Sequence, residues 1–320
     1  MINKYMSLYK YVSPTIGIKI IENKKIRFSQ IKALNDTFEM KPHYEQLAPD
    51  GFMKEIFNFG GEEVQNTGFN LGYDFIEQVF EEIKNSSPKE FHNDIAQIQN
   101  QIPEREKFLE QAKSEHPDFI ENNLLPLHHE QMPGIREVVS SEFNDKLGIL
   151  CLSELCDSLT MWAHYAQNSE GFVIEFDENH EFFNMPEFEG SILGKLQKVS
   201  YSPERINKQN LIDLTPEDIA FCKSESWDYE REWRMVKNLS DETLLLDEAN
   251  EPVKDLKEQP IHLFPFPIES MKGIILGSRI KDIDKKKIIE ILSREEHEHI
   301  NLLQAVEDER EYKLNINAIN

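Results

Sequence analysis

The stretch GILCLSELCDSLTMWAHYAQNSEGFVIEFD, residues 148–177, predicts the fold class of the chain. Its opening run, GILCL, is short and apolar, which is typical of a buried strand. The following SLTMWAHYAQNSEG predicts a short helix that ends at Gly171. FVIEFD then predicts a second strand, on which Val173 and Glu175 share one face. A strand, a helix and a strand in succession indicate that helices and sheet alternate here.

Further strands and helices are predicted on both sides of this stretch. Residues 16–21 fit either a helix or a strand. A helix is predicted at 215–226, because Thr215 can cap its N-terminus and Pro216 suits the first helical position. Other predicted elements are strands at 7–12, 195–202 and 271–280, a helix at 281–296, and two extended segments within 300–317. The pattern predicts an α+β fold with a mixed sheet core.

The section from residue 42 to 142 has a different character. It is strongly polar, with apolar residues three and four positions apart, which predicts a mainly helical insertion. Pro103 falls where a helix would break or begin. We therefore expect one elaborated α+β domain over residues 1–320, with 42–142 as the insertion. This insertion either packs on the core as an amphipathic layer or offers a surface to a protein partner.

Composition indicates which partners and which cellular compartment to expect. The 320 residues include 35 Lys and Arg against 59 Asp and Glu, a formal net charge of -24. That charge opposes any general affinity for nucleic acid or an anionic membrane. The three cysteines form no CxxC pair, which fits a reducing compartment. Because no stretch approaches the roughly 20 apolar residues of a membrane span, we expect a cytoplasmic protein without a membrane anchor.

The common nucleotide and metal motifs are missing from the sequence. It contains neither GxxxxGK[ST] nor GxGxxG, which argues against P-loop and Rossmann proteins. His128 and His129 are adjacent, so on a helix their side chains would point apart rather than to one metal ion. We predict no metal site.

The segment WDYEREWRMV, residues 227–236, carries the strongest charge pattern. If it forms one strand, Glu230, Glu232 and Arg234 project to one face. One carboxylate of such a face can stabilise a developing cation while the other orients a nucleophile, and Arg234 can hold an anionic substrate or Glu232. The same spacing suits an ion-paired strand edge with tryptophans packed beneath it. Spacing alone leaves both interpretations open.

Six fragments of the sequence, in their order, resemble a known family. They are SLYKYVS, NKKIRFSQIKALNDTFE, LCLSE, MWAHYAQNSEGFVIEFD, KVSYS and WDYEREWRMV. Together they resemble the mainly bacterial domain-of-unknown-function family 2971, over residues 8–38 and about 148–236. Their order is also similar, more distantly, to that of the ADP-ribosyltransferase fold.

The more distant resemblance implies a substrate and a first set of site residues. NAD is the implied substrate, and Tyr9 or Lys10 on an early strand would hold its nicotinamide ribose. Phe28 and Ser29 would form an aromatic and serine platform beside it.

The resemblance also implies the residues that carry the chemistry. Glu230 or Glu232 would bond the ribose and support the oxocarbenium-like transition state as nicotinamide leaves. Apart from that resemblance, we expect His164 to act with them as a third catalytic group. The other residues expected to bind a flat, phosphorylated ligand are Tyr11, Arg27, Asn35, Asp36, Trp162, Tyr165 and Arg234.

Three functions are therefore kept. The leading expectation is an ADP-ribosyltransferase-like or NAD-handling effector of bacterial defence or toxin type, which attacks a nucleotide or a macromolecule. The first alternative is a sensor module that binds a nucleotide or a partner without turnover. The lesser alternative is a metal-dependent nuclease, for which the candidate carboxylates are Glu154, Glu175, Glu230 and Glu232.

Overall fold

The computed structural model describes residues 7–52, 104–114 and 125–319, with the short pieces 73–74, 77–82, 84–85, 96 and 99–100 between them. Pro103 lies outside the described residues. The chain divides into two compact units. The first unit comprises Met1–Met40, Asn144–Arg205 and Ala220–Asn320, and the second comprises Lys41–Phe143 and Ile206–Ile219.

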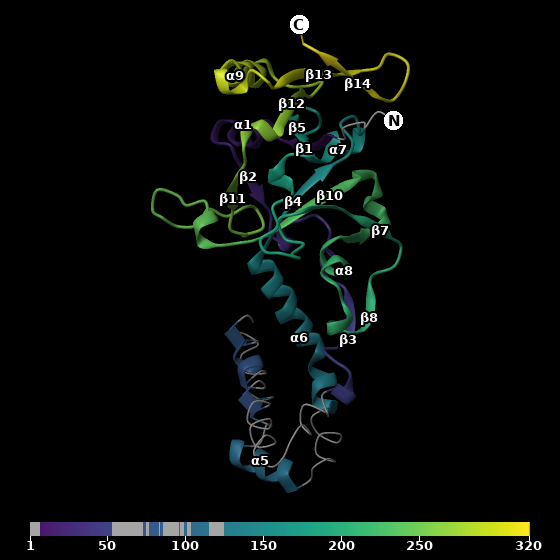
Figure 1. Cartoon of the computed structure of the whole chain (residues 1–320), viewed down its shortest axis with the longest axis vertical. Coiled ribbons are helices and arrows are strands. Elements are labelled where there is room, and N and C mark those ends of the chain that lie inside the picture. The colour runs from purple at the N-terminus through teal and green to yellow at the C-terminus, as the bar shows by residue number, and fades with distance from the viewer. Residues whose placement is uncertain are drawn as a thin grey trace. The chain divides into compact units, whose positions relative to one another are not determined.

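An eight-stranded sheet organises the first unit, in the order β14-β13-β12-β5-β1-β4-β10-β6 (Figure 1). All neighbouring strands are antiparallel except β12 and β13, which are parallel. The strands are β1 Ser7–Val12, β4 Leu147–Ser153, β5 Phe172–Asp177, β6 Leu196–Lys198, β10 Glu232–Asn238, β12 Met271–Leu276, β13 Asn301–Glu307 and β14 Leu314–Ala318. Helices combined with a mixed sheet confirm the predicted α+β class.

The ladder between β1 and β4 is much shorter than its neighbours. These two strands share a single register pair, Tyr9 with Ser153, whereas β1 pairs with β5 through six positions, Ser7 to Val12. On its other side β4 pairs with β10 from Leu147 to Ser153. Side chains near the short β1–β4 ladder therefore have room to line a cavity in the middle of the sheet.

Both faces of the sheet are buried, which explains why β5 reads as an almost continuous apolar run. Ile174 joins one core cluster, together with buried residues of helices α1 Pro14–Asn23 and α9 Asp282–Leu292. The adjacent Val173 joins a second cluster with Trp162 of helix α7 Leu159–Tyr165. Because successive residues of a strand face opposite sides, the two clusters lie on opposite faces.

The predicted helix of residues 158–171 is shorter than expected. It ends at Tyr165, and Gln167, Asn168 and Ser169 follow with positive φ values of 50, 54 and 66°. Gly171 lies beyond this left-handed turn, and a Cβ there would come within 2.1 Å of the Val12 carbonyl oxygen. The glycine is therefore required by the close approach of two backbones rather than by a helix end.

Several other predicted boundaries also change. Residues 16–21 lie within helix α1. The predicted helix 215–226 is only α8 Pro216–Ala220, although Thr215 accepts the predicted capping bond from the Asp218 amide at 3.1 Å. Its C-terminal part instead forms strand β9 Cys222–Ser224, which pairs with β7 Ser200–Ser202. The strand predicted at 195–202 is thus divided between β6 and β7.

Among the described residues, the longest helices of the second unit are α5 Arg105–Ser114 and α6 Leu125–Lys146, whose last residues belong to the first unit. Strand β3 His43–Gln46 pairs in parallel with β8 Asn207–Asn210. The predicted insertion at 42–142 therefore corresponds to most of this unit, but the unit also takes in residues 206–219.

The remaining short elements complete the described chain. Strand β2 Lys25–Phe28 pairs with β11 His262–Pro265. The 3-10 helices are η1 Ile31–Ala33, η4 Glu181–Phe183, η5 Leu211–Asp213, η6 Glu225–Glu230, η7 Asp241–Thr243, η8 Ile268–Ser270 and η9 Glu295–His297. Of the helices within the described residues, none has the length and apolar character needed to cross a membrane.

Candidate functional site

The segment 227–236 is not one strand, contrary to prediction. Its first part belongs to the 3-10 helix η6, which ends at Glu230, and strand β10 begins at Glu232. Arg231 stands between them in the left-handed region, with a φ of 45°, and its amide closes the helix by donating to Asp228. Glu230 and Glu232 therefore leave the backbone from a helix end and a strand start.

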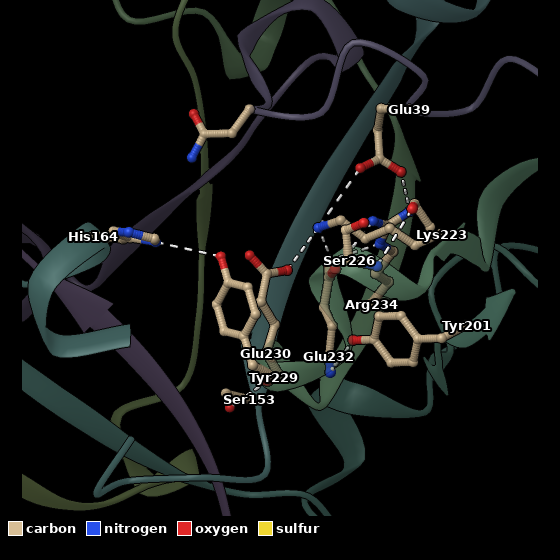
Figure 2. A network of polar contacts seen from close by, with 12 residues as sticks. Glu39, Ser153, His164, Tyr201, Lys223, Ser226, Tyr229, Glu230, Glu232 and Arg234 are labelled. Carbon is tan, nitrogen blue, oxygen red and sulfur yellow. Dashed lines mark hydrogen bonds and ion pairs between the residues drawn. The ribbon is translucent and has the colours of Figure 1, made fainter. Parts of the chain in front are cut away.

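Lys223 of β9 nevertheless brings the two carboxylates together, as Figure 2 shows. Its Nζ lies 2.6 Å from Oε2 of Glu230 and 3.0 Å from Oε2 of Glu232. A third carboxylate, Glu39, has Oε2 at 3.8 Å from the same nitrogen. All three glutamates are buried. A single ammonium group is thus shared among three carboxylates, two of them close together in sequence and the third, Glu39, far from both.

Arg234 completes this ionic network and is fully buried. Its guanidinium donates to Oε1 of Glu232 from Nε at 2.7 Å and to Oε2 from Nη2 at 3.1 Å. Nη1 donates to Oε1 of Glu39 at 2.6 Å and to the Ala220 carbonyl at 2.9 Å. Glu232 and Arg234 do share one face of a strand, as predicted. Arg234 binds Glu232 and Glu39, so each of its three guanidinium nitrogens already donates to a group of the protein.

The network sets the ionisation of its members. Burial alone would raise the pKa of Glu232, but Arg234 and Lys223 outweigh it and lower that pKa. Burial opposes the charge of Lys223 as well, yet the carboxylates Glu232, Glu230 and Glu39 raise its pKa overall. For Glu39 burial is the dominant effect and raises the pKa despite the attraction of Arg234. Glu232 and Lys223 are therefore held in their charged forms.

Glu230 has a second partner on its other oxygen. The Tyr165 hydroxyl donates to Oε1 of Glu230 at 2.5 Å, and Nδ2 of Asn35 donates to that hydroxyl at 3.3 Å. Burial, and then Glu230 itself, raises the pKa of Tyr165, which keeps the phenol a neutral donor. Both oxygens of Glu230 are thus fixed, one by Lys223 and one by Tyr165.

These groups line a cavity of about 400 Å³ within the first unit. Its wall is built from β1, the segment after β2, β4, α7, β9, η6 and β10. The sequence-predicted residues that the structure brings into this wall are Tyr9, Lys10, Tyr11, Ser29, Asn35, His164, Tyr165, Glu230, Glu232 and Arg234. Residues from distant parts of the sequence therefore converge on one polar cavity.

Within the wall, the predicted residues differ in their hydrogen bonds to the protein and in their exposure. Tyr11 donates its hydroxyl to the Leu155 carbonyl at 2.8 Å and is mostly buried. Nζ of Lys10 donates to the Cys151 carbonyl at 3.0 Å. Nδ1 of His164 lies 3.3 Å from the Tyr229 hydroxyl, and the imidazole is exposed. Of these three residues, His164 is exposed, Lys10 is half-buried and Tyr11 is buried.

Four predicted residues lie outside the cavity wall. Arg27 of β2 donates to Asp255 at 2.6 Å, in the segment that leads to β11, the partner strand of β2. Phe28 is fully buried against Phe264, so its ring offers no platform to a ligand. Trp162 is a core residue whose Nε1 donates to the Cys156 carbonyl at 2.8 Å. The fourth, Asp36, accepts a bond from the Phe38 amide at 2.9 Å.

Sequence reasoning missed Glu39, Lys223 and Tyr229. Glu39 is the last residue of NDTFE, a fragment that carries the family resemblance, and this was the available signal. Lys223 precedes Glu230 by seven positions, a spacing that indicates no contact in an undivided strand. A buried lysine keeps its charge only when carboxylates lie around it, and those of Lys223 come from elements that the sequence does not show to be adjacent.

Within the part of the chain that the structure describes, no group of three or more His, Cys, Asp or Glu side chains could hold a metal ion. Of the two adjacent histidines, His129 lies with Nε2 at 3.4 Å from Oδ1 of Asp50.

Comparison with known proteins gives one match. A family model described as "Protein of unknown function (DUF2971)" matches residues 161–235, which run from α7 to β10. The matched segment contains Tyr165, Lys223, Glu230, Glu232 and Arg234. No curated protein and no solved structure matches the chain. The resemblance to this family is supported over the segment that carries most of the ionic network.

Proposed function

We propose that the chain acts on an NAD-like dinucleotide and cleaves the bond between ribose and the nicotinamide nitrogen. The observation that carries this proposal is the fixed state of Glu230, whose oxygens are held by Tyr165 at 2.5 Å and Lys223 at 2.6 Å inside a polar cavity. The role as an effector of bacterial defence or toxin type comes from the family resemblance and belongs to the same proposal.

The proposed reaction breaks one bond and forms another. The electron pair of the glycosidic bond leaves with the nicotinamide nitrogen, and positive charge develops on the ribose. An oxygen of water or of an acceptor then attacks the anomeric carbon and releases its proton to solvent. A carboxylate that is already in place stabilises that charge without reorganising during the reaction. Glu230 is the carboxylate we assign to this step.

The formal charge of the network supports this assignment. Glu39, Glu230 and Glu232 provide three formal negative charges, Lys223 and Arg234 provide two positive charges, and Lys10 in the same wall provides a third. The five-residue network alone carries one negative charge, which favours a ribosyl cation beside Glu230. The cavity volume of about 400 Å³ also lies within the usual range of small-molecule sites.

The sensor alternative rests on the same contacts. Every charged group of the network already has a protein partner, which is also the arrangement of a rigid binding site without turnover. In that case NAD raises the melting temperature by mass action and no product forms. The nuclease alternative requires carboxylates open to a metal ion, whereas Lys223 and Arg234 hold those of the cavity.

The test is to incubate the purified protein with NAD, with and without bacterial lysate, and to measure nicotinamide and ADP-ribose adducts by mass spectrometry. We expect Glu230→Gln to lower nicotinamide release by about 100-fold or more. Glu154→Gln is the matched control, because Glu154 binds Lys198 and Trp233 and is not in the cavity wall.

Two results would overturn the proposal. One is full activity in a folded Glu230→Gln variant. The other is the absence of nicotinamide release by the folded wild-type protein in both conditions. If NAD then still raises the melting temperature of the wild type, the sensor function replaces the enzymatic one.

A further inference from the structure

A row of four aromatic rings begins at the cavity wall and continues beyond it. Tyr165 and His164 of α7 have ring centroids 6.2 Å apart, at an interplanar angle of 77°. His164 is 6.1 Å from Tyr229, at 73°, and Tyr229 is 6.1 Å from Trp227, at 37°. Tyr165 and His164 line the cavity, whereas Tyr229 and Trp227 lie on the 3-10 helix η6 next to it. These four residues are called the aromatic row.

The aromatic row is accessible, unlike the platform that the sequence predicted. His164 is exposed, and Tyr165, Trp227 and Tyr229 are each partly exposed. Phe28 and Trp162, in contrast, are buried in the core. A flat ring that enters the cavity therefore meets the aromatic row and has no access to Phe28.

Contacts already made by the aromatic row indicate which charge it favours. Nζ of Lys223 lies 4.9 Å from the centroid of the Trp227 ring, so the indole already takes part in a cation–π contact. The negative face of an aromatic ring attracts cations in this way. The same helix also presents two exposed acids, Glu225 and Asp228, beside Trp227. Rings and acids together favour a positively charged partner.

We infer that the aromatic row binds a flat, positively charged nitrogen ring of the N-substituted pyridinium class. The choice of ring rests on the proposed function, in which the departing group is such a pyridinium. The position is independent of it, because it follows from the accessible rings and the adjacent acids. The row thus assigns the base of the substrate to α7 and η6, with Glu230 beside it bound to Tyr165.

The probe for this inference is 1-methylnicotinamide, which carries the permanent charge and has no glycosidic bond to cleave. Its affinity is measured by calorimetry and by quenching of tryptophan fluorescence, with neutral nicotinamide as the comparison. We expect the cation to bind about tenfold more tightly than nicotinamide, and to quench Trp227. High salt should weaken its binding, because exposed acids attract it.

Two variants locate the site, and a third serves as control. Trp227→Leu and Tyr229→Leu should each weaken binding of 1-methylnicotinamide by about fivefold or more, while Trp227→Phe keeps most of the affinity. Tyr312→Leu is the control, because Tyr312 is a fully exposed aromatic residue outside the aromatic row. Circular dichroism and the thermal melting temperature are measured to check that each variant is folded.

The outcomes separate this inference from the proposed reaction. Equal affinity for the charged and neutral probes overturns the inference, and so does unchanged affinity in folded Trp227→Leu and Tyr229→Leu variants. If the protein releases nicotinamide from NAD but the variants do not change probe binding, the inference is wrong and the proposed reaction is retained. If the probe binds at the aromatic row but no nicotinamide is released, the proposed reaction is wrong and the inference is retained.

Discussion

Arg234 and Glu39 lie 195 positions apart in the sequence, yet Nη1 of the arginine donates to Oε1 of the glutamate at 2.6 Å. Neither side chain is more than 2% exposed. The contact joins the segment that follows η1 to the inner strand β10. Because the same segment carries Asn35, which bonds Tyr165, this pair helps to hold one wall of the cavity in place.

Replacement of Arg234 by methionine should destabilise the protein strongly. The change leaves Glu39 and Glu232 buried with Lys223 as their remaining cation, and breaking a buried pair costs about 3–5 kcal/mol. Urea unfolding at pH 7 measures the loss. Arg310→Met, at an exposed position, should change the free energy of unfolding by less than about 0.5 kcal/mol.

A double variant tests the pair itself. When Glu39→Gln is combined with Arg234→Met, the loss should be smaller than the sum of the two single losses by about 1 kcal/mol or more, because one buried charge is removed with its partner. Strict additivity in the urea experiment would show that the two residues are not energetically coupled.

Acid should destabilise the protein partly through Glu232. The pKa of Glu232 in the folded state is lowered from an ordinary value of 4.5, so its contribution is complete well above pH 4.5 and is lost as the pH falls below it. Glu232→Gln removes this titration. Between pH 5 and 3 its free energy of unfolding should fall less steeply, by up to about 1.4 kcal/mol per pH unit.

The comparison requires urea unfolding at several pH values for the wild type and for Glu232→Gln. Glu189→Gln, at an exposed position, should retain the wild-type slope. An equal slope in all three proteins would contradict a lowered pKa for Glu232.

Gly277→Ala should disturb the turn behind α7. A Cβ at this position would lie 2.2 Å from the Ser169 carbonyl oxygen and 2.6 Å from that of Gly171. Both contacts are to backbone, so we expect a loss of about 2 kcal/mol or more in thermal or urea unfolding. Gly51→Ala, where a Cβ meets nothing within 4 Å, is the matched substitution and should be close to neutral. A stable Gly277→Ala variant would mean that the left-handed turn can shift.

Tyr165→Phe should separate positioning of Glu230 from folding. It removes the donor to Oε1 of Glu230, and under the proposed reaction kcat should fall by about tenfold or more. Tyr201→Phe is the comparison, because the Tyr201 hydroxyl accepts a hydrogen bond from the Glu232 amide at 2.8 Å and Tyr201 is not part of the cavity wall. This variant should retain kcat. If both variants lose kcat in proportion to their loss of folding stability, Tyr165 has only a structural role.

The prediction of the fold from sequence succeeded where local patterns are strong. The run GILCL forms β4, FVIEFD forms β5, and Thr215 caps its helix as expected. It was wrong for WDYEREWRMV, because the left-handed Arg231 separates a 3-10 helix from a strand, and alternating charges give no sign of that break.

In the candidate site, too, local patterns placed some residues correctly and others wrongly. Glu232 and Arg234 could be placed on one face because a strand alternates with period two. Phe28 was misplaced because its aromatic ring suits a buried core as well as a binding platform, and only the β2–β11 pairing shows which applies.

Local periodicity was enough to predict the α+β class and the shared face of Glu232 and Arg234, since both follow from patterns within a few residues. The tertiary structure alone decided that Lys223, Glu39 and Tyr165 would meet Glu230 and Glu232. Those contacts connect the segment after η1, α7, β9, η6 and β10. A buried charge is stable only when partners surround it, and long-range chain packing, which local spacing does not encode, brings those partners together.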